Sequence, residues 1–392
     1  MHAVHVIPSL EPETGGPAQS VPALCRALRG NDIEISLCTF RPPGGVAVEL
    51  PNQDFSLRHF EPLWGSRQLP TKEFYKTFRQ VLRDADIVHL HSLWNPCIST
   101  AAFACRQEQV PYIISPRGML QQTSLRRRAT LKRMYKQVCE LRTIAGAAAL
   151  HFLSDSEAID SRPAFPNGTP TFVIPNGIET GLAQAIEPGR FIASYPSLRG
   201  KKIVLFVGRV HWSKGLELQL AAMEIVARDN PDCVWVMIGP DGGEASAIQN
   251  QARQKLPDQQ FLYTGMLAHR QVLEALRDAA VFLLTSRNEA HSMAMNEALA
   301  VGVPMVLTET VGFHAIASAG AGYSVPANPP AIAKAISKLL SDRNQAARMA
   351  SRGQRYAAEQ LDWITIARAM TARYEQILAR RRPGTKPMAQ HG

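Results

Sequence analysis

Two glutamates, Glu289 and Glu297, stand eight positions apart, just after a short apolar run at residues 281–286. The small residues around them predict a loop that enters a helix, and the N-terminal end of a helix favours anions. Because a helix rises 1.5 Å per residue, eight residues span about 12 Å. One carboxylate can therefore lie in the loop and the other on the helix, each bound to hydroxyl groups at one end of an extended ligand. A ligand with a phosphate between two polyols is a nucleotide sugar.

Two cations, Arg209 and Lys214, follow another apolar run at residues 203–207 and stand beside Gly208 and Gly215. Arginine can donate two parallel hydrogen bonds to phosphate oxygens, and lysine adds a point charge. The stretch lacks the G-x-x-x-x-G-K-[ST] pattern of a P-loop. We interpret it as a phosphate-binding loop of another kind, and the alternative is an ordinary surface loop.

Further turns follow other apolar runs. The pair Gly15-Gly16 precedes a helical segment, and glycine lets the backbone approach a phosphate or sugar closely, although a simple turn is the alternative. Gly239 and Thr264 begin turns in the second half of the chain. Because ligands bind at the carboxyl ends of parallel strands, we expect these turns to border one cleft.

The order of the segments predicts an α/β fold. Short apolar runs alternate with amphipathic segments, and the pattern restarts after a stretch with no clear period that ends near residue 200, which predicts two Rossmann-like domains facing each other across a cleft. The expected strands lie at residues 4–7, 33–38, 87–90, 112–115, 148–152 and 172–174, and then at 203–207, 234–238, 261–263, 281–285 and 304–307. We expect domains at residues 1–178 and 179–362, a last helix at 363–379, and a disordered basic tail at 380–392.

Composition favours a cytoplasmic enzyme. The chain has 392 residues, 45% of them apolar, which is ample for two cores. It contains no run of the roughly 18 apolar residues that a membrane span needs, and its first residues do not resemble a signal peptide. The six cysteines are scattered through apolar contexts without metal-binding spacing, so we expect reduced core residues.

A basic segment at residues 126–142 holds seven Lys or Arg and one Glu. Arg128, Lys132 and Lys136 form one stripe of a predicted helix, with an apolar stripe opposite. One interpretation is a surface helix with a solvated basic face. The other is attraction to an anionic membrane surface or an anionic acceptor. Nucleic acid is disfavoured because neither a pattern of interleaved aromatic residues nor a known motif accompanies the charges.

Taken in order along the chain, these motifs resemble the retaining glycosyltransferases of GT-B fold, family four, also called group-one transferases. The resemblance covers almost the whole chain, and it includes a final helix, starting at Trp363, that in the family crosses back to the N-terminal domain. Arg117 within the S-P-R-G-M-L stretch and the H-x-H-S-L-W run from His89 resemble a branch associated with bacterial surface polysaccharide assembly. The motifs are Gly15-Gly16, His89-Leu-His91, Ile174-Pro-Asn-Gly-Ile, Val207-Gly-Arg209 with Lys214-Gly215, Gly239-Pro-Asp241, Thr264-Gly265 and Glu289-x7-Glu297.

The resemblance implies roles for individual residues. Arg209 and Lys214 would neutralise the diphosphate of a nucleotide-sugar donor, Glu297 would hold the ribose and Glu289 the sugar. The remaining donor-binding residues would be Gly16, Gly239, Thr264, Ala290, His291 and Ser292. The family typically needs neither a metal nor another cofactor, and the lone D-x-D at Asp84 and Asp86 is interpreted as a structural coincidence.

Two positions depart from the family. Where the first glutamate is commonly followed by Gly-Phe-Gly, this chain has Ala290-His291-Ser292, which could reshape the sugar pocket. Where many members carry a catalytic-site histidine, this chain has Arg117, a permanent cation that cannot act as a base. Arg117 could instead bind the leaving phosphate or an anionic acceptor. His91 is either its substitute or a packed strand-end residue.

The implied reaction is transfer to an acceptor hydroxyl by front-face displacement, with the departing phosphate accepting the proton. The acceptor would be a glycan or a lipid-linked glycan, approached from the side of His91, Arg128 and Lys132, and the protein would lie in the cytoplasm or at the inner face of the cytoplasmic membrane. The alternatives are a nucleotide-sugar epimerase or hydrolase, and a non-catalytic partner in a glycosylation complex.

Overall fold

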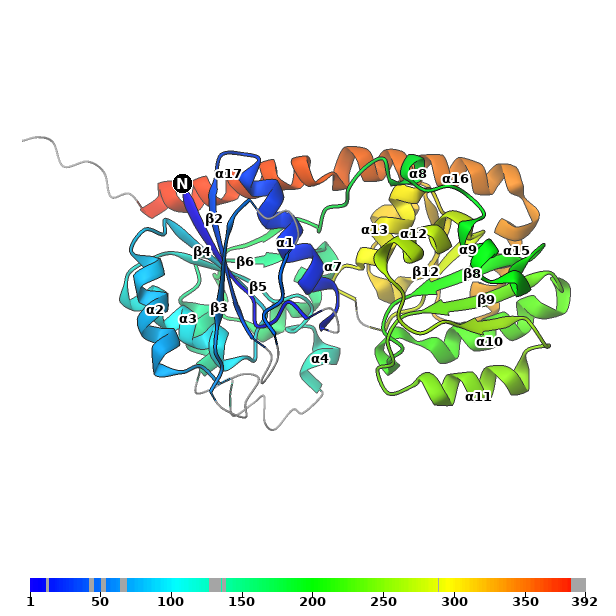
Figure 1. Cartoon of the computed structure of the whole chain (residues 1–392), viewed down its shortest axis with the longest axis horizontal. Coiled ribbons are helices and arrows are strands. Elements are labelled where there is room, and N and C mark those ends of the chain that lie inside the picture. The colour runs from blue at the N-terminus through cyan, green and yellow to red at the C-terminus, as the bar shows by residue number, and fades with distance from the viewer. Residues whose placement is uncertain are drawn as a thin grey trace, which may run out of the picture.

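The computed structural model describes residues 1–11, 14–41, 46–50, 54–63, 69–126, 135, 139–287 and 289–381. Within this part of the chain two parallel sheets lie side by side, each covered by helices (Figure 1). The predicted fold class is therefore confirmed. No helix of the described residues is long and apolar enough to cross a membrane.

The first sheet has seven parallel strands in the order β3-β2-β1-β4-β5-β6-β7. The strand order changes direction between β1 and β4, where His5 pairs with His89. One strand, β3, was not predicted, because its residues alternate between polar and apolar and only its last is buried. The strands are β1 (His2–Val6), β2 (Glu34–Phe40), β3 (Ser56–Phe60), β4 (Ile87–His91), β5 (Tyr112–Ser115), β6 (Ala149–Phe152) and β7 (Thr171–Val173).

Helices cover both faces of this sheet because its strands are apolar on both sides. One apolar cluster joins α2 (Lys72–Leu82) and α3 (Pro96–Gln107) to one face. Another joins α1 (Gly16–Arg29) and α17 (Trp363–Arg381) to the other face. Shorter helices connect the later strands: α4 (Gln122–Arg126), α6 (Leu141–Ala145) and α7 (Asp155–Ser161).

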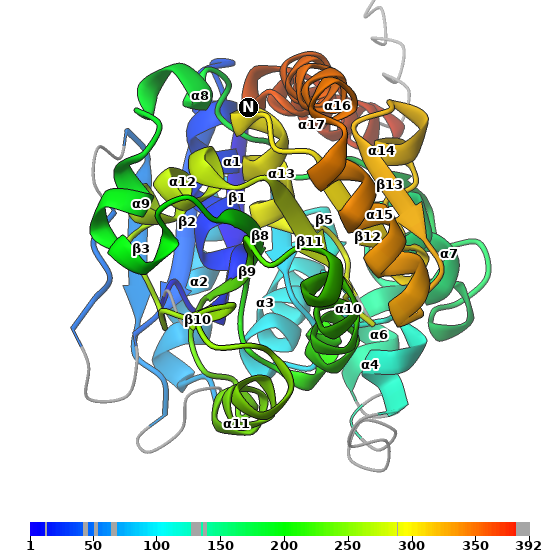
Figure 2. The same cartoon turned by 90° about the vertical axis from the view of Figure 1, so that its right-hand side faces the viewer.

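The second sheet has six parallel strands in the order β10-β9-β8-β11-β12-β13, with its reversal between β8 and β11. Figure 2 looks onto this half and shows helices on both sides of the sheet. The strands are β8 (Lys202–Val207), β9 (Cys233–Ile238), β10 (Phe261–Tyr263), β11 (Val281–Leu284), β12 (Met305–Thr308) and the unpredicted β13 (Gly322–Val325). The helices are α8 (Leu182–Ala185), α9 (Arg190–Ser194), α10 (Leu216–Asp229), α11 (Ala245–Lys255), α12 (His269–Asp278), α13 (Met293–Val301), α14 (Ala315–Ser318), α15 (Pro329–Ser341) and α16 (Arg343–Tyr356).

The two halves are joined twice, and both connections meet at one place. From the N-terminal half to the C-terminal half, the chain passes through Ile178, whose N–H donates to the Leu361 carbonyl at 2.7 Å. Returning, α16 and α17 run along both halves, and α17 packs on α1 (Figure 1). Gly177 lies against the Trp363 ring so closely that a Cβ there would overlap the ring. The crossing is therefore a tightly packed junction.

This packing predicts the effect of Gly177→Ala. The added methyl should lower the free energy of unfolding by about 1–3 kcal/mol, the usual cost of overpacking a filled space. Urea denaturation followed by circular dichroism measures the change. In a Trp363→Leu background the same methyl should cost less, because the ring is gone. An equal cost in both backgrounds would show that the ring does not restrict this position.

Candidate functional site

The loop between β8 and α10 carries both predicted phosphate-binding cations. Arg209 is exposed, and it follows Gly208, whose φ of 155° disfavours other residues. Lys214 ends a short turn of 3-10 helix, and Gly215 then adopts φ 62° before α10 begins. The left-handed glycine turns the chain sharply, so the lysine side chain and the start of α10 lie at the same edge of the sheet.

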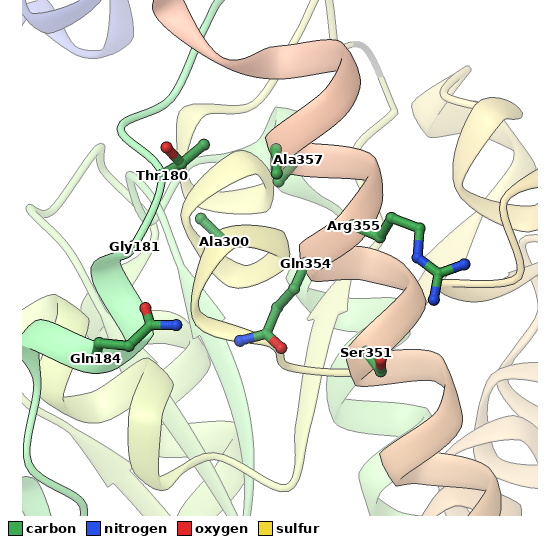
Figure 3. Close-up of a pocket in the computed structure, with 9 residues that line it drawn as sticks. Thr180, Gly181, Gln184, Ala300, Ser351, Gln354, Arg355 and Ala357 are labelled. Carbon is green, nitrogen blue, oxygen red and sulfur yellow. The ribbon is translucent and has the colours of Figure 1, made fainter.

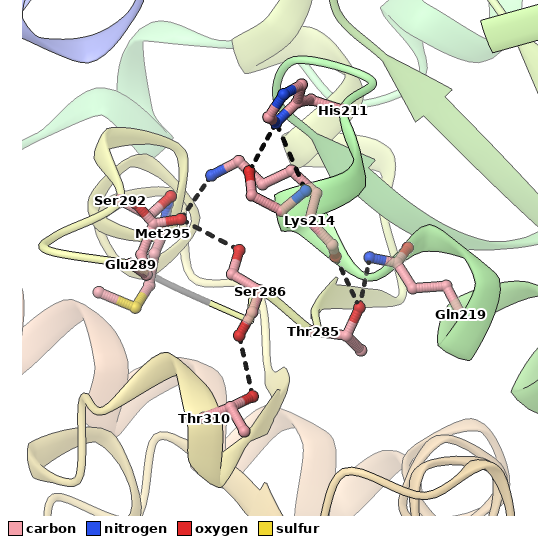
Figure 4. Close-up of polar contacts among 10 residues, drawn as sticks. His211, Lys214, Gln219, Thr285, Ser286, Glu289, Ser292, Met295 and Thr310 are labelled. Carbon is pink, nitrogen blue, oxygen red and sulfur yellow. Dashed lines mark hydrogen bonds and ion pairs between the residues drawn. The ribbon is translucent and has the colours of Figure 1, made fainter. Parts of the chain in front are cut away.

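Thr285, directly after β11, holds this loop in place. Its hydroxyl lies 3.0 Å from the Lys214 carbonyl oxygen and 2.9 Å from that of Gly215 (Figure 4). A Cβ at Gly215 would overlap the Thr285 carbonyl oxygen, so only glycine permits the approach. The side-chain amide of Gln219 donates to the Thr285 hydroxyl at 3.1 Å. The loops after β8 and β11 are thus one packed unit.

Glu289 meets Lys214 within this unit. The Lys214 ammonium lies 2.5 Å from Glu289 Oε2, and the Ser286 hydroxyl donates to the same oxygen at 3.1 Å (Figure 4). Side-chain exposure is 20% for the lysine and 13% for the glutamate, so the pair is partly shielded from water. The structure therefore brings Lys214, which was predicted to bind the diphosphate, into direct contact with Glu289, which was predicted to bind the sugar.

Glu297 lies on α13, one turn into the helix, and is 5% exposed. Its Oε1 is 2.9 Å from Nε2 of His269, the first residue of α12. Hydrogen bonding to Glu297 raises the pKa of His269, which favours the imidazolium. Sequence reasoning did not identify His269, although its place five residues after Thr264 puts it in a turn already predicted to border the cleft.

The three residues that depart from the family precede α13. Ser292 caps the helix by accepting from the Met295 N–H at 3.3 Å. His291 is buried, packs edge-on against Phe313, and lies 2.8 Å from the side-chain oxygen of Asn296. Burial lowers the pKa of His291 to about 4, so the ring is neutral. His291 thus fills a packed position, as an aromatic residue would.

The N-terminal half approaches this site mainly through backbone. A Cβ built on Gly15 would lie 3.8 Å from Nη2 of Arg209, and one on Gly16 would lie 3.7 Å from Cγ of Met293. One on Gly118 would lie 3.4 Å from the Ala290 Cβ. These contacts place the loops after β1 and β5 directly opposite the cation and glutamate loops.

Arg117 lies behind Gly118 in a strained conformation, with φ 53°. Its guanidinium donates to the Ser20 hydroxyl at 3.0 Å and lies 3.3 Å from Nδ1 of His91. Burial lowers its pKa to about 10, so it remains a cation at neutral pH. Arg117 is therefore a fixed positive charge next to Gly118, which lies opposite Ala290.

His91 is fully buried, and it belongs to a group of imidazoles whose association sequence reasoning did not identify. His5 and His89 lie with it, and each of the three offers a nitrogen within 4.8 Å of the others. Burial lowers the pKa of His91 well below its usual range, so the ring is neutral. The structure places His91 behind Arg117, and its predicted part in acceptor binding stays a prediction.

The turns after β9 and β10 hold two further predicted residues, Gly239 and Thr264. A Cβ on Gly239 would overlap the Gly208 carbonyl oxygen, and the Tyr263 hydroxyl donates to the Gly239 carbonyl at 3.0 Å. The Thr264 hydroxyl donates to the Gly265 carbonyl at 3.0 Å. The Gly239 turn thus packs against the loop that carries Arg209, and the Thr264 turn packs on Gly239, whose N–H donates to the Gly265 carbonyl at 2.9 Å. Arg128, Lys132 and Lys136 lie outside the described residues.

A separate pocket opens at the far end of α13 (Figure 3). It contains none of the predicted site residues. Its lining comes from the start of α8, the end of α13 and the last turns of α16, including Thr180, Gln184, Ala300, Ser351, Gln354 and Arg355.

Comparison with known proteins assigns a family to each half of the chain. Residues 15–177 match the family described as glycosyl transferase 4-like domain, and residues 190–356 match the family described as glycosyl transferases group 1. The two matches follow the two sheets in the order observed here. The chain therefore belongs to the glycosyltransferases of GT-B fold that combine these two domains.

Individual relatives are more distant. The chain is 28% identical to glycogen synthase of Mycobacterium tuberculosis over 54% of its own length and 50% of that protein. It is 25% identical to the lipopolysaccharide core biosynthesis mannosyltransferase LpsB of Rhizobium meliloti, over 56% of its own length and 65% of that protein. The aligned region thus spans about half to two thirds of these relatives.

Among solved structures, Anabaena HepE in complex with UDP and glucose superposes with a TM-score of 0.75, over 95% of this chain and 99% of that one. The two sequences are 16% identical. At this identity the likeness shows the fold.

The geometry predicts that Arg209→Ala and Lys214→Ala each weaken binding of a nucleoside diphosphate. Loss of one hydrogen bond to a charged group should cost about 1.5–3 kcal/mol of binding free energy. Titration calorimetry measures the affinity. Arg270→Ala, which removes an exposed cation paired with Glu274 on α12, is the control and should bind as the wild type does. Unchanged affinity in both loop variants would contradict the assignment.

The His269–Glu297 pair predicts a pH dependence of stability. Because the folded pKa of His269 is raised, its contribution is fully present below the unfolded pKa of about 6.5 and is lost as pH rises through the folded pKa. The melting temperature should therefore fall more steeply above that pH in the wild type than in His269→Gln. Thermal melts across this range test the difference, and parallel curves would exclude a native-state charge interaction.

Proposed function

We propose that this chain transfers a sugar from a nucleoside diphosphate sugar to a hydroxyl group of an acceptor. The arrangement of Arg209, Lys214, Glu289 and Glu297 at one sheet edge, facing the backbone of Gly15, carries this proposal. The cations suit a diphosphate, and the two carboxylates suit the hydroxyl groups on either side of it. A uridine nucleotide is the first donor to test, because HepE was solved with UDP.

The proposed transfer retains the anomeric configuration. The bond from the sugar's anomeric carbon to the phosphate oxygen breaks, and the acceptor oxygen bonds to that carbon on the same face. The departing phosphate oxygen takes the acceptor's proton, so no protein base is required. Arg209 and Lys214 stabilise the negative charge of the leaving diphosphate. Glu289 already accepts hydrogen bonds from Lys214 and Ser286. In the proposed reaction it accepts hydrogen bonds from hydroxyl groups of the donor sugar and does not act as a nucleophile.

The proposal includes no metal cofactor. Two side-chain cations and the N-terminal end of α13 supply the positive potential that a divalent ion would otherwise provide. Asp86 of the lone D-x-D accepts from the backbone N–H of His2 at 2.8 Å, at the start of β4 and not at its carboxyl end. Arg117 adds a further fixed cation, suited to the leaving phosphate or to an anionic acceptor.

For the acceptor we propose a lipid-linked glycan of bacterial surface polysaccharide assembly, with the protein at the inner face of the cytoplasmic membrane. The stretch around Arg117 resembles that branch of the family, and LpsB is named as a lipopolysaccharide core biosynthesis enzyme. The basic stripe of Arg128, Lys132 and Lys136 would attract anionic lipid, at about 1 kcal/mol per charge near the surface.

The test incubates the purified protein with nucleotide sugars, beginning with UDP-glucose, and with extracted lipid-linked glycans. We expect transfer that survives EDTA and gives a product with the donor's anomeric configuration by NMR. Lys214→Ala should lose most of the activity, whereas Arg270→Ala should keep it.

The other outcomes contradict the proposal in different ways. Epimerisation or hydrolysis of the donor without an acceptor would support the epimerase or hydrolase alternative. Nucleotide binding without turnover of any donor would support a non-catalytic role. Loss of transfer in EDTA, restored by Mn²⁺ or Mg²⁺, would overturn the metal-free mechanism.

A further inference from the structure

A row of polar side chains crosses the interior of the N-terminal half. His5, His89, Ser115 and His151 stand near the carboxyl ends of β1, β4, β5 and β6, and His91 ends β4. All five are 2% exposed or less. They lie on the face that α1 and α17 cover, and Tyr374 of α17 joins them there. Buried imidazoles in such number require a hydrogen-bond partner for every nitrogen.

The positions of the imidazole protons in the first half of the row follow from Arg117, which can only donate hydrogen bonds. Its guanidinium lies 3.3 Å from Nδ1 of His91, so that nitrogen accepts and the proton of the neutral ring is on Nε2. Nε2 of His91 is 3.0 Å from Nδ1 of His5, which therefore accepts in turn. The His5 proton is then on Nε2, 3.4 Å from the Tyr374 hydroxyl oxygen.

The second half continues in the same direction. The Tyr374 hydroxyl donates to Nδ1 of His89 at 2.8 Å, so His89 carries its proton on Nε2 and donates to the Ser115 hydroxyl oxygen at 2.9 Å. Ser115 donates to Nδ1 of His151 at 2.6 Å. Nε2 of His151 then donates to the Ile174 carbonyl oxygen at 2.8 Å. A carbonyl only accepts, so the chain ends there with every imidazole nitrogen paired.

The same nitrogens could be considered a metal site, since His5, His89 and His91 gather closely. A metal ion needs a free lone pair from each ring. In the chain described above, the lone pair of each ring already accepts a hydrogen bond from its neighbour. Arg117, 3.3 Å from His91, also opposes a second cation. Hydrogen bonding therefore accounts for these histidines better than metal binding does.

We propose that Tyr374 is a positioning residue, whose hydroxyl joins the two halves of this chain and thereby holds the Arg117 guanidinium in its place next to Gly118. Tyr374 stands on the helix that returns from the C-terminal half, and it is the only member of the chain from that helix among the described residues. Its effect on sugar transfer rests on the proposed function, in which Arg117 binds an anionic group of the reactants. Its effect on the tautomers does not.

The first test is independent of activity. Histidine-selective ¹⁵N labelling and long-range ¹H–¹⁵N NMR distinguish the two neutral tautomers. We expect His5, His89, His91 and His151 to be neutral Nε2–H tautomers at pH 7. In Tyr374→Phe, the resonances of His91 should change although the two side chains have no direct hydrogen bond, because the change passes through His5. Tyr323→Phe, which removes a buried hydroxyl that has no hydrogen-bond partner among the described residues, should leave all four unchanged.

The second test measures function. Tyr374→Phe should lower kcat on the order of tenfold, the loss expected from one hydrogen bond, while nucleotide affinity stays within about twofold because the cation loop is untouched. Tyr323→Phe should transfer as the wild type does. Ser115→Ala provides a second variant: it removes the serine link and leaves only the 3.3 Å contact between His89 Nε2 and His151 Nδ1, so it should change the resonances of both rings.

Each contrary result is distinct. Nδ1–H tautomers, imidazolium signals, or stoichiometric Zn²⁺ binding that shifts these resonances would overturn the chain. Unchanged His91 resonances in Tyr374→Phe would overturn the positioning role. Wild-type kcat in Tyr374→Phe, alongside the expected NMR changes, would show that the chain does not act on transfer. If no donor is turned over, the proposed function fails and the NMR result still decides the positioning role.

Discussion

The close approach of Gly215 to Thr285 is the constraint on which the rest of the candidate site depends. It joins the loop after β8 to the end of β11, across the point where the strand order of the second sheet reverses. Crevices form at such points because neighbouring loops leave in opposite directions. Here the approach places the loop of Lys214 against the segment that leads to Glu289, and the two side chains form an ion pair. The cation and the carboxylate of the proposed donor site therefore lie side by side in one packed unit.

The N-terminal half complements this unit with backbone and with buried charge. Its loops after β1 and β5 place Gly15 and Gly118 opposite Arg209 and Ala290, where an added Cβ would lie 3.8 Å and 3.4 Å from these side chains. Arg117 contributes the charge, as a buried cation that donates a hydrogen bond to Ser20 and another to His91. Because the chain from Arg117 runs through a residue of α17, the helix that joins the two halves also supports the N-terminal side of the cleft.

Most of the fold could be predicted because parallel strands buried on both faces are continuous apolar runs. The edge strand β3 lacked that signal. The cations and glutamates of the site could be identified because each follows such a run. The histidine row could not, since it depends on the register between strands: His5 faces His89, and His91 faces Ser115. His89 and His91 are two positions apart in β4, so they lie on the same face of the sheet. Only the register between strands brings them together with the histidines of the other strands.

The central claim, that Lys214 binds the diphosphate while Glu289 binds the sugar, is tested most directly by comparing two ligands on one variant. Glu289→Gln removes the carboxylate charge with little change of shape and leaves Lys214 free. Calorimetry should then show a nucleoside diphosphate bound at least as tightly as by the wild type, and the corresponding nucleoside diphosphate sugar bound about tenfold more weakly, as for one hydrogen bond to a charged group. Equal weakening of both ligands would contradict the division of roles between the two residues.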